Sequence, residues 1–448
     1  MIDYKNIASD TVTKAKKAGA DHVDVIIRSN VGKDVEIRLG KIEKLNNSET
    51  KGLGLRIFKN QKASLTYTSD FSSQSIDKLI KKTIDLCEIS GSDEFRQLPD
   101  PKYLGRYAGK LNLFDSTISK IPMDKKLEIA KRVEEIGRSK SKYITNTEGA
   151  WWSDGEGSTT LANSHGFCDQ TASTNCSFGV FLVAEKNNDK FVDYWYSSNR
   201  FYNNLESVES VANEAAQRLL RKLDFRKPKT QKVPIVFDPF IARSLLSSLL
   251  EASSGYSVYQ KSSFFIDKLG KKVANDKFNL IDDGTMIDGQ GSAPFDDEGI
   301  KTNKNVIIDN GILNKYLCDT YSGLKLNMTP TGNASRGYSS NPRVSSTNLY
   351  LDKGEYSPEQ IISSVKNGLY LTNFLGGGTN PVTGDYSQGA AGVWITDGKL
   401  DYSVQEFTVA GNMLDMISNI EMIGNDLDFR TSTACPTILI PNMMISGA

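Results

Sequence analysis

Short runs of alternating apolar residues, separated by turn-forming residues, constrain the fold of this chain most strongly. Near the N-terminus Val23, Val25 and Ile27 alternate with other residues, which is the pattern of a half-buried β-strand. Asn310-Gly311 separates two apolar runs and is a strong signal for a β-hairpin. We find no repeat with a period of roughly 20 to 50 residues, which excludes solenoids and propellers. The sequence therefore predicts an α+β fold with a large antiparallel β-rich region in its C-terminal half.

Helical periodicity and boundary signals divide the chain into three parts. Amphipathic or capped patterns predict helices at residues 1–20, 72–89, 123–139, 205–223 and 240–253, and one after Pro358. The run 218–232 holds seven basic residues and one acidic residue, which we interpret as a solvated linker. We expect an N-terminal α+β domain at 1–105, a central α+β segment packed with it at 106–226, and a C-terminal β-rich domain at 227–448.

Histidine is nearly absent, since His22 and His165 are the only two in 448 residues. A Ser-His-Asp triad needs an imidazole base, and a histidine-rich zinc site needs two or three imidazoles that converge. The two histidines lie in segments that look unrelated, so we expect both to be structural. We therefore expect the function of this chain not to depend on imidazole chemistry of its own.

Charge and cysteine content limit the compartment and the partners. The 54 basic and 54 acidic residues cancel, whereas binding through phosphate neutralisation needs a concentrated basic face, so we expect no direct contact with nucleic acid. No apolar run approaches the roughly 20 residues that span a bilayer, and the N-terminus does not resemble a secretory signal, so we expect no membrane contact. The five scattered cysteines (87, 168, 176, 318 and 435) then indicate reduced thiols in a cytoplasmic protein.

The common catalytic motifs are missing from the sequence. There is no phosphate-binding loop, and Gly376-Gly-Gly lacks the lysine and the helix that such a loop needs, which favours a tight strand connection. Gly52-Leu-Gly fails as a dinucleotide fingerprint at its third glycine. The run Gly384-Asp-Tyr-Ser387-Gln-Gly389 has one residue too many for a nucleophile elbow, and no histidine lies nearby in the sequence. We therefore predict no catalytic residue in this chain.

Three further segments allow two interpretations each. The acidic segment 281–299 could bind a cation or supply an acid/base pair, but Asx-type turns explain it more simply. Cys168 and Cys176 are more readily free thiols than zinc ligands. The aromatic cluster 191–202 could stack bases or line a groove, although cross-strand packing is the simpler interpretation.

Taken together, several ordered motifs resemble the TldD/PmbA family, once called modulators of DNA gyrase and regarded as peptidases. The resemblance covers nearly the whole chain and rests on Glu36-Ile-Arg, Gly52-Leu-Gly-Leu-Arg-Ile-Phe, Ser257-Val-Tyr-Gln-Lys-Ser-Ser-Phe, Ile281-Asp-Asp-Gly, Pro294-Phe-Asp-Asp-Glu-Gly, Thr331-Gly-Asn-Ala-Ser-Arg, Gly376-Gly-Gly-Thr-Asn, Val382-Thr-Gly-Asp-Tyr-Ser and Glu406-Phe-Thr-Val-Ala-Gly-Asn.

The family has two branches, and the resemblance is to the PmbA/TldE-like one. In the TldD branch the helix that opens the C-terminal domain carries His-Glu-x-x-x-His, and a cysteine near the C-terminus completes the zinc site. Here that helix reads Ser247-Ser-Leu-Leu-Glu-Ala-Ser-Ser-Gly-Tyr, without histidine, and Cys435 precedes Pro436 and is more readily a buried thiol. The resemblance thus implies a subunit with no metal or cofactor of its own. Glu251 remains, but without a metal-bound water it has nothing to activate.

The resemblance also implies a partner and a substrate class. We expect the chain to form a heterodimeric zinc metalloprotease with a zinc-bearing TldD-like subunit, acting on unfolded or small peptides, or to form a homodimer when alone. Arg336, Asp385 and Ser387 are substrate-groove candidates that could grip a peptide added as a strand, with turn structure as the simpler role. The alternatives are a stand-alone hydrolase that uses serine or aspartate chemistry, and a non-enzymatic binding module linked to DNA gyrase.

Overall fold

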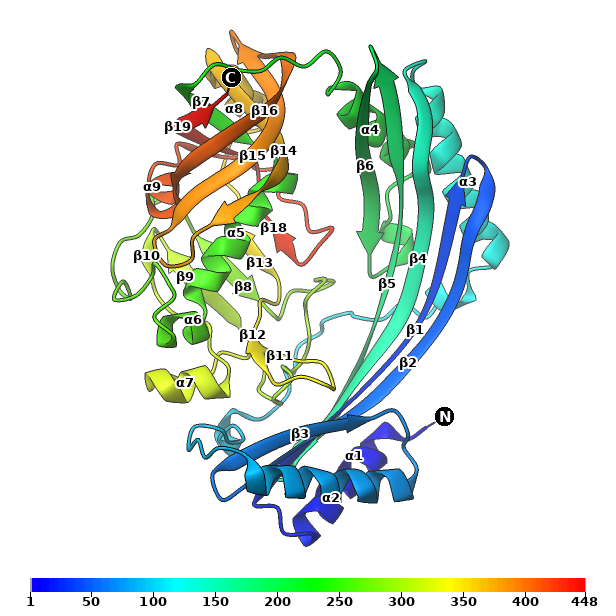
Figure 1. Cartoon of the computed structure of the whole chain (residues 1–448), viewed down its shortest axis with the longest axis vertical. Coiled ribbons are helices and arrows are strands. Elements are labelled where there is room, and N and C mark those ends of the chain that lie inside the picture. Colours follow the sequence, from blue (N-terminus) through cyan, green and yellow to red (C-terminus); the bar gives the residue numbers. More distant parts are fainter. Residues whose placement is uncertain (1, 448) are drawn as a thin grey trace.

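The computed structural model describes residues 2–447, and its first half is built on one long antiparallel sheet with the strand order β3-β2-β1-β4-β5-β6. Figure 1 shows this curved sheet beside the C-terminal lobe. Pairing of β1 with β4 runs from Asp24–Asn163 to Ile37–Ala150, so the N-terminal and central segments share a single sheet. The strands are β1 (His22–Arg38), β2 (Lys41–Lys59), β3 (Lys62–Thr68), β4 (Ile144–Asn163), β5 (Cys168–Lys186) and β6 (Asp189–Asn199).

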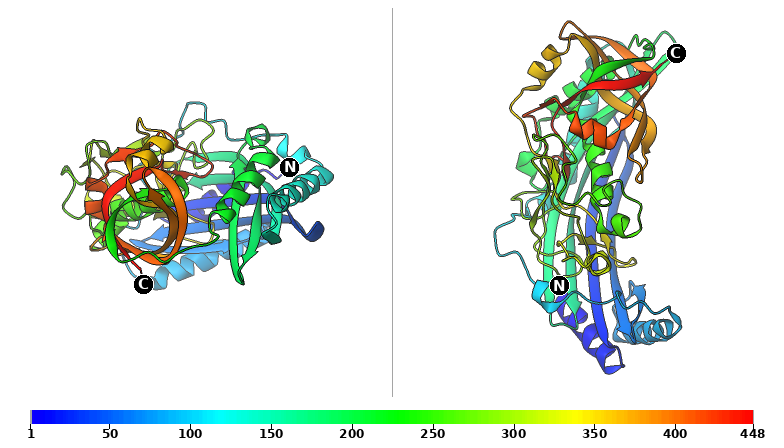
Figure 2. Two further views of the ribbon diagram at one scale, coloured as in Figure 1. Left: turned by 90° about the horizontal axis from the view of Figure 1, so that it is seen from above. Right: turned by 90° about the vertical axis from the view of Figure 1, so that its left-hand side faces the viewer.

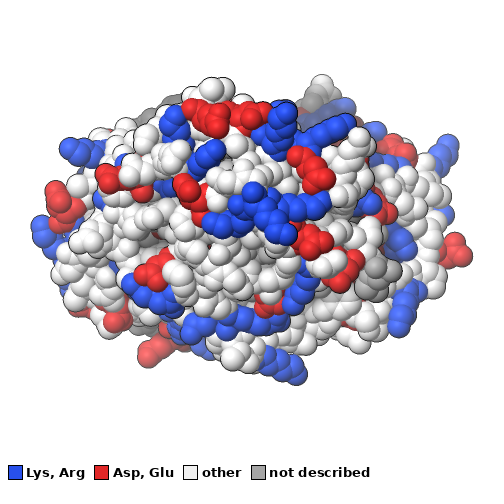
Figure 3. All heavy atoms as spheres, turned by 90° about the horizontal axis from the view of Figure 1, so that it is seen from below, with Lys and Arg blue, Asp and Glu red and all other residues white. Residues whose placement is uncertain are grey.

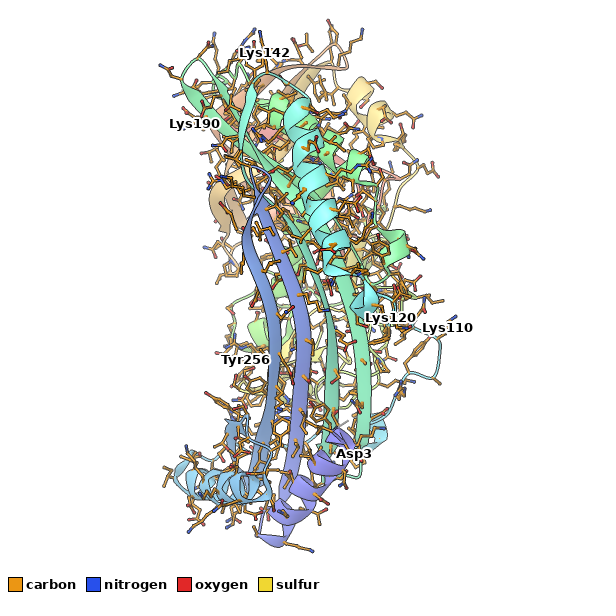
Figure 4. All side chains as sticks on the ribbon, turned by 90° about the vertical axis from the view of Figure 1, so that its right-hand side faces the viewer. Asp3, Lys110, Lys120, Lys142, Lys190 and Tyr256 are labelled. Atoms are coloured by element: carbon orange, nitrogen blue, oxygen red, sulfur yellow. The ribbon has the colours of Figure 1, made fainter. Side chains whose placement is uncertain are left out.

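Helices cover one face of this sheet. Figure 4 shows α3 (Met123–Ser139) along that face, with α1 (Tyr4–Lys17) toward the end near Asp3. The predicted alternation is confirmed, because Val23, Val25 and Ile27 are buried in one core with α1 and α2 (Ser73–Ile89). A second core lies beneath α3 and α4 (Val208–Leu220). Successive strand residues point to opposite faces, so residues 24, 26 and 28 face the C-terminal lobe.

The C-terminal lobe contains a closed barrel. β16 pairs with β15 and also with β19, which closes the ring β16-β15-β14-β7-β19 seen from above in Figure 2. β14 runs parallel to β7, and β13 runs parallel to β18. The lobe is therefore β-rich as predicted, but it is not wholly antiparallel, because long connections separate these pairs. The barrel strands are β7 (Gln231–Phe237), β14 (Asn367–Thr379), β15 (Asp385–Thr396), β16 (Lys399–Asn412) and β19 (Ile438–Ser446), with β17 (Met422–Ile423) on β19.

A smaller five-stranded sheet and several helices complete this lobe. The Asn310-Gly311 hairpin is confirmed between β9 and β10, and both turn residues have positive φ, at 47° and 76°. The sheet consists of β10 (Ile312–Leu313), β9 (Lys304–Asp309), β8 (Leu280–Asp283), β13 (Leu349–Leu351) and β18 (Thr433–Ala434), beside the pair β11 (Ala334–Ser335) and β12 (Arg343–Val344). The helices are α5 (Pro239–Ser253), α6 (Gly255–Tyr259), α7 (Thr320–Leu326), α8 (Pro358–Ser364) and α9 (Met413–Ser418), and 3-10 turns lie at Pro101–Tyr103, Ile118–Lys120 and Tyr202–Asn204.

Two features differ from the sequence-based expectations. The basic run 218–232 is not simply a solvated linker, since Arg218 pairs with Asp238 at 3.2 Å and the Arg226 guanidinium lies 4.1 Å from the Tyr402 ring centroid. The two histidines, expected in unrelated segments, stack edge to face with ring centroids 5.0 Å apart. Tertiary packing brought both sets of residues together. None of the helices within residues 2–447 combines the length and the apolar content that a membrane crossing requires.

Candidate functional site

A cavity of about 590 Å³ lies where the long sheet meets the C-terminal lobe. The sheet contributes side chains of β2 and β3, and the lobe contributes the ends of α5 and α6, an acidic loop and α7. The lining is mainly charged and aromatic: Arg56, Phe58, Phe95, Arg96, Glu251, Tyr256, Glu298, Asp319, Tyr321 and Arg343 contribute most of its functional groups.

The break between α5 and α6 forms one wall of this cavity. Gly255 donates its backbone N–H to the Leu317 carbonyl at 2.7 Å, and a Cβ at this position would lie 2.6 Å from the Cys318 sulfur. Just before the break, Glu251 accepts a hydrogen bond of 2.6 Å from the Ser257 hydroxyl. Ser257 is only 2% exposed, so this Ser–Glu pair holds the two helices together and does not present a nucleophile to a substrate.

A buried ion-pair network connects the cavity to the domain junction. The Arg56 Nε lies 3.0 Å from both carboxylate oxygens of Asp24, its cross-strand neighbour. Arg336, from the C-terminal lobe, donates to the same carboxylate at 3.0 Å. Burial alone would raise the pKa of Asp24, but the two guanidinium groups hold it below its usual range. The network therefore joins the long sheet to the C-terminal lobe through fully desolvated charges.

The acidic turn Pro294–Gly299 supplies two buried carboxyl groups beside this network. Burial raises the pKa of Asp296 well above its usual value, and Glu298 adds to the shift by repulsion. Burial also raises the pKa of Glu298, although the Arg56 guanidinium, 3.7 Å away, opposes it. Asp296 accepts backbone hydrogen bonds from Glu298 and Ile300 at 2.9 and 3.0 Å. The interpretation of this segment as Asx-type turns is thus confirmed for Asp296.

Two of the quoted motifs meet through hydrogen bonds in the core of the lobe. Asn333, in Thr331–Arg336, donates at 2.7 Å to Asp282, in Ile281–Gly284. Thr347 donates to the same carboxylate from its backbone and its hydroxyl. Burial raises the pKa of Asp282 to about 6. These motif residues therefore belong to the buried interior of the lobe and do not form a surface site.

The residues around the cavity do not fit the zinc site that the TldD branch implies. Residues 239–259 contain no histidine. His22 lies opposite the lining residue Phe58 in the β1–β2 pairing, but its ring packs against His165 and neither histidine is among the lining residues. Within residues 2–447 no three His, Cys, Asp or Glu side chains group in a way that could hold a metal ion. Cys435 is buried, and burial raises the pKa of its thiol. The residues around the cavity therefore do not make a metal-binding set.

The three substrate-groove candidates lie in different places. The Arg336 side chain is fully buried in the ion-pair network. Asp385 is exposed and holds the β14–β15 turn, accepting hydrogen bonds from Thr383 at 2.7 Å and from Asn412 at 3.2 Å. Ser387 is exposed on β15, opposite Gly378. Only Asp385 and Ser387 are thus brought together. Gly376-Gly-Gly lies within the same strand pair, as the strand interpretation predicted.

The substrate-groove candidates predicted from the sequence do not include the charged residues that line the cavity, such as Arg56 and Glu298. Arg56 lies in the quoted motif Gly52-Leu-Gly-Leu-Arg-Ile-Phe and Asp24 lies in the alternating run of β1. Neither pattern indicates the buried network, because it forms only when the two strands and Arg336 come together. A weak signal existed in Gly52-Leu-Gly54. A Cβ on Gly54 would lie 2.0 Å from the Tyr338 carbonyl oxygen. The absence of side chains at these glycines therefore allows the C-terminal lobe to contact β2 closely.

Models of three family domains match this chain. They are the PmbA/TldA metallopeptidase domain 1 at residues 23–87, the central domain at 116–223 and the C-terminal domain at 230–447. The chain is 33% identical to Metalloprotease PmbA of Escherichia coli O157:H7, covering 98% of this chain and 95% of that protein. It is 30% identical to the Metalloprotease PmbA homolog of Haemophilus influenzae, covering 99% and 96%.

Solved structures share the whole fold. A Bacteroides thetaiotaomicron protein described under the name modulator of DNA gyrase superposes with a TM-score of 0.93 and is 30% identical, with both chains fully covered. TldE from Thermococcus kodakarensis superposes with a TM-score of 0.89 at 21% identity, covering 98% of this chain and 100% of that one. The second likeness concerns the fold alone.

Proposed function

Because this chain belongs to the PmbA/TldD metallopeptidase family, we propose that it is the PmbA/TldE-like subunit of a heterodimeric zinc metalloprotease. The zinc belongs to a TldD-like partner, and the pair acts on unfolded or small peptides in the cytoplasm. This chain contributes no catalytic residue. It completes the chamber and holds the substrate.

The observation that carries the proposal is the composition of α5 and α6. These helices border the cavity of about 590 Å³, yet they offer Glu251, Ser254 and Tyr256 and no histidine. A catalytic zinc needs three protein ligands and an open position, which carboxylate and hydroxyl groups at this spacing do not supply. In this proposal the partner subunit therefore supplies the zinc ligands.

The long sheet supports a role in holding peptides. β3 pairs with β2 only from Leu53 onward. Within residues 2–447, β2 between Lys41 and Lys51 therefore pairs with β1 on one side and has a free edge on the other. A free edge offers backbone N–H and C=O groups that an extended peptide can pair with. Lys41, Lys44 and Lys51 on this stretch discourage unspecific edge pairing.

Mixed surface charge favours a peptide over a nucleic acid as the ligand. Figure 3 shows Lys and Arg beside Asp and Glu across the lower face of the molecule. Exposed lysines pair with acidic residues, as in Lys14–Asp77 at 2.8 Å and Lys5–Asp169 at 3.0 Å. The described part of this face carries no concentrated basic patch that could neutralise phosphates, and the net charge of zero does not favour one, so the gyrase-linked binding module is the weaker alternative.

Co-expression with a His-Glu-x-x-x-His homologue from the same genome tests the proposal. We expect the two chains to co-purify, with zinc and chelator-sensitive cleavage of an unfolded peptide found only in the pair. Glu→Gln in the partner's motif is the matched control and should abolish cleavage without preventing assembly.

Two results contradict the proposal. Tightly bound zinc in the purified chain alone would place the metal in the wrong subunit. Peptide cleavage by the chelator-treated chain alone would indicate a stand-alone hydrolase.

A further inference from the structure

A row of aromatic side chains crosses the long sheet on the face opposite α3, which is turned away from the viewer in Figure 4. Ring centroids are 5.3 Å apart for Trp151 and Phe181, 4.8 Å for Phe181 and Tyr194, and 6.2 Å for Tyr194 and Tyr196. Phe240, on α5, lies 5.8 Å from Tyr194 and continues the row to the C-terminal lobe. These five residues are called the aromatic row below.

Strand register and one glycine create the row. Phe181 on β5 lies directly opposite Tyr194 on β6, while Trp151 on β4 lies opposite Gly179. A Cβ on Gly179 would come within 2.4 Å of the Trp151 indole, so the glycine lets this ring lie across β5 toward Phe181. The neighbouring Trp152 points the other way and is fully buried in the core beneath α3 and α4.

The aromatic row is not a closed core. Its five rings are half-buried, whereas the rings on the opposite face, such as Trp152 and Phe178, are buried. Neither Tyr194 nor Tyr196 forms a hydrogen bond through its hydroxyl group within residues 2–447. Cross-strand packing accounts for the order of the rings. Arg243 and Arg430 cover Phe240 and Tyr196 at the lobe end, 3.9 and 5.8 Å from the ring centroids. Within the described part of the chain no cation lies over Trp151, Phe181 or Tyr194, so these three rings remain available to a ligand.

A cavity of about 310 Å³ opens at the Trp151 end of the row. Trp151 and Phe181 line it together with the carboxylates of Asp34, Glu36 and Glu148 and with the ammonium of Lys44. None of these four charged groups forms a salt bridge within the described part of the chain. The cavity thus combines aromatic faces with an excess of negative charge.

We propose that the aromatic row and this cavity form a docking groove for an extended polypeptide, with a lysine or arginine side chain of that peptide in the cavity and its apolar side chains on the row. The inference rests on the proposed function in one respect, which is that an unfolded peptide is the ligand. It names which peptides the subunit prefers and where it holds them.

Charge complementarity selects the occupant. A cation gains from the negative face of an aromatic ring and from carboxylates that outnumber nearby cations. Among the described residues, Lys44, opposite Glu36, is the one cation in the cavity lining, against the three carboxylates of Asp34, Glu36 and Glu148. An extended chain repeats its side chains on one face every second residue, a spacing that can follow rings on successive strands. The same carboxylates repel phosphate, so the base-stacking interpretation of the aromatic cluster is not favoured.

Binding of short unstructured peptides to the isolated full chain tests this groove. The probes are capped peptides that share one Gly/Ser framework and carry leucines with lysines, leucines with glutamates, or lysines alone, measured by titration calorimetry at low salt. We expect the leucine–lysine peptide to bind at least about tenfold more tightly than either other probe, and to weaken as salt rises.

Matched variants locate the site. The double substitution Glu36→Gln/Glu148→Gln should weaken the leucine–lysine peptide about tenfold, and Phe181→Leu should weaken both leucine-bearing probes. Glu49→Gln removes a carboxylate from the same hairpin outside the cavity and should change nothing beyond its effect on net charge. Circular dichroism and thermal unfolding of each variant confirm that it is folded.

Equal binding of the lysine and glutamate probes, or undiminished binding by the folded double variant, would overturn the groove. An equal loss of leucine–lysine peptide binding in Glu49→Gln would show that only net charge matters, and this result would also overturn the groove. These outcomes are independent of pair assembly. A pair that assembles and cleaves while the double variant binds normally refutes only the groove, whereas a chain that binds as expected but never pairs refutes only the proposed function.

Discussion

Gly54 shows how a single residue on a strand controls contact between distant parts of this chain. On β2 it lies beneath the backbone of Tyr338, and a Cβ would come within 2.0 Å of the Tyr338 carbonyl oxygen. Gly52 likewise lies beneath the Tyr338 ring. Glycine in a strand interior weakens the strand and often marks a site where another backbone approaches closely. Two glycines at positions 52 and 54 are therefore explained by the contact with Tyr338.

We predict that Gly54→Ala lowers the free energy of unfolding by about 3 kcal/mol, because the obstruction is backbone and cannot rotate away. Gly91→Ala is the control, since a Cβ there meets no atom within 4 Å and should change stability by no more than about 0.5 kcal/mol. Thermal unfolding of both variants measures the difference. Equal midpoints for the two would show that the lobe does not press on β2.

At the scale of an element, α3 is held to β4 by a buried ion pair. Lys126 is fully buried on α3, and its ammonium pairs with Asp154 on β4. The Trp152 indole donates to the same carboxylate at 2.6 Å. Apolar residues of α3 such as Ile129, Ala130 and Val133 provide the rest of the contact. The ion pair thus fixes the position of α3 along β4, because apolar contacts alone are not directional.

Lys126→Met should destabilise the protein by about 3–5 kcal/mol, since it leaves the Asp154 carboxylate buried without a counter-ion. The neighbouring Lys125 is exposed, and its one salt bridge within residues 2–447 is to Glu128 on the surface, so Lys125→Met should cost no more than about 0.5 kcal/mol. Chemical denaturation followed by tryptophan fluorescence reports both. A double substitution Lys126→Met/Asp154→Leu should recover most of the loss, and its failure to do so would contradict this account.

At the scale of the whole molecule, charged residues hold the two lobes together. Arg336 reaches from the C-terminal lobe to Asp24 on β1, and its Nε donates to the Asp297 carbonyl at 3.1 Å. Arg28 on β1 reaches in the opposite direction and donates to the Asp297 carboxylate at 2.5 Å. Removal of one member leaves others buried without partners, so the junction depends on the complete set.

Arg336→Gln should lower stability by about 3 kcal/mol at neutral pH and should move acid unfolding to higher pH. The pKa of Asp24 is depressed in the folded protein, so its contribution is present above the unfolded value and is lost as pH falls through the folded value. Without Arg336 the pKa of Asp24 rises, and the loss begins at a higher pH. Circular dichroism across an acid titration measures this midpoint.

Arg132→Gln is the control for this titration, because Arg132 pairs with Glu209 on the exposed surface. An acid midpoint in Arg336→Gln that matches the control would show that Asp24 does not depend on Arg336.

Local patterns account for the parts of the fold that sequence analysis predicted. Val23, Val25 and Ile27 identify a strand because alternation is a property of neighbouring residues, and Asn310-Gly311 identifies a hairpin because both residues accept positive φ. The family resemblance rests on motifs of the same local kind, and the family models and the relatives confirm it. None of these signals says which side chains meet across the lobes.

The sequence by itself determined the α+β class, the family and the absence of histidine from α5. Only the tertiary structure decided that Arg336 is a buried junction residue, that Arg56 pairs with Asp24 beside the main cavity, and that the rings of three strands and one helix align in a row. The physical reason is the sequence separation of the interacting residues. Backbone preferences act between neighbours, whereas burial, ion pairing and ring stacking depend on residues that lie up to several hundred positions apart in the chain.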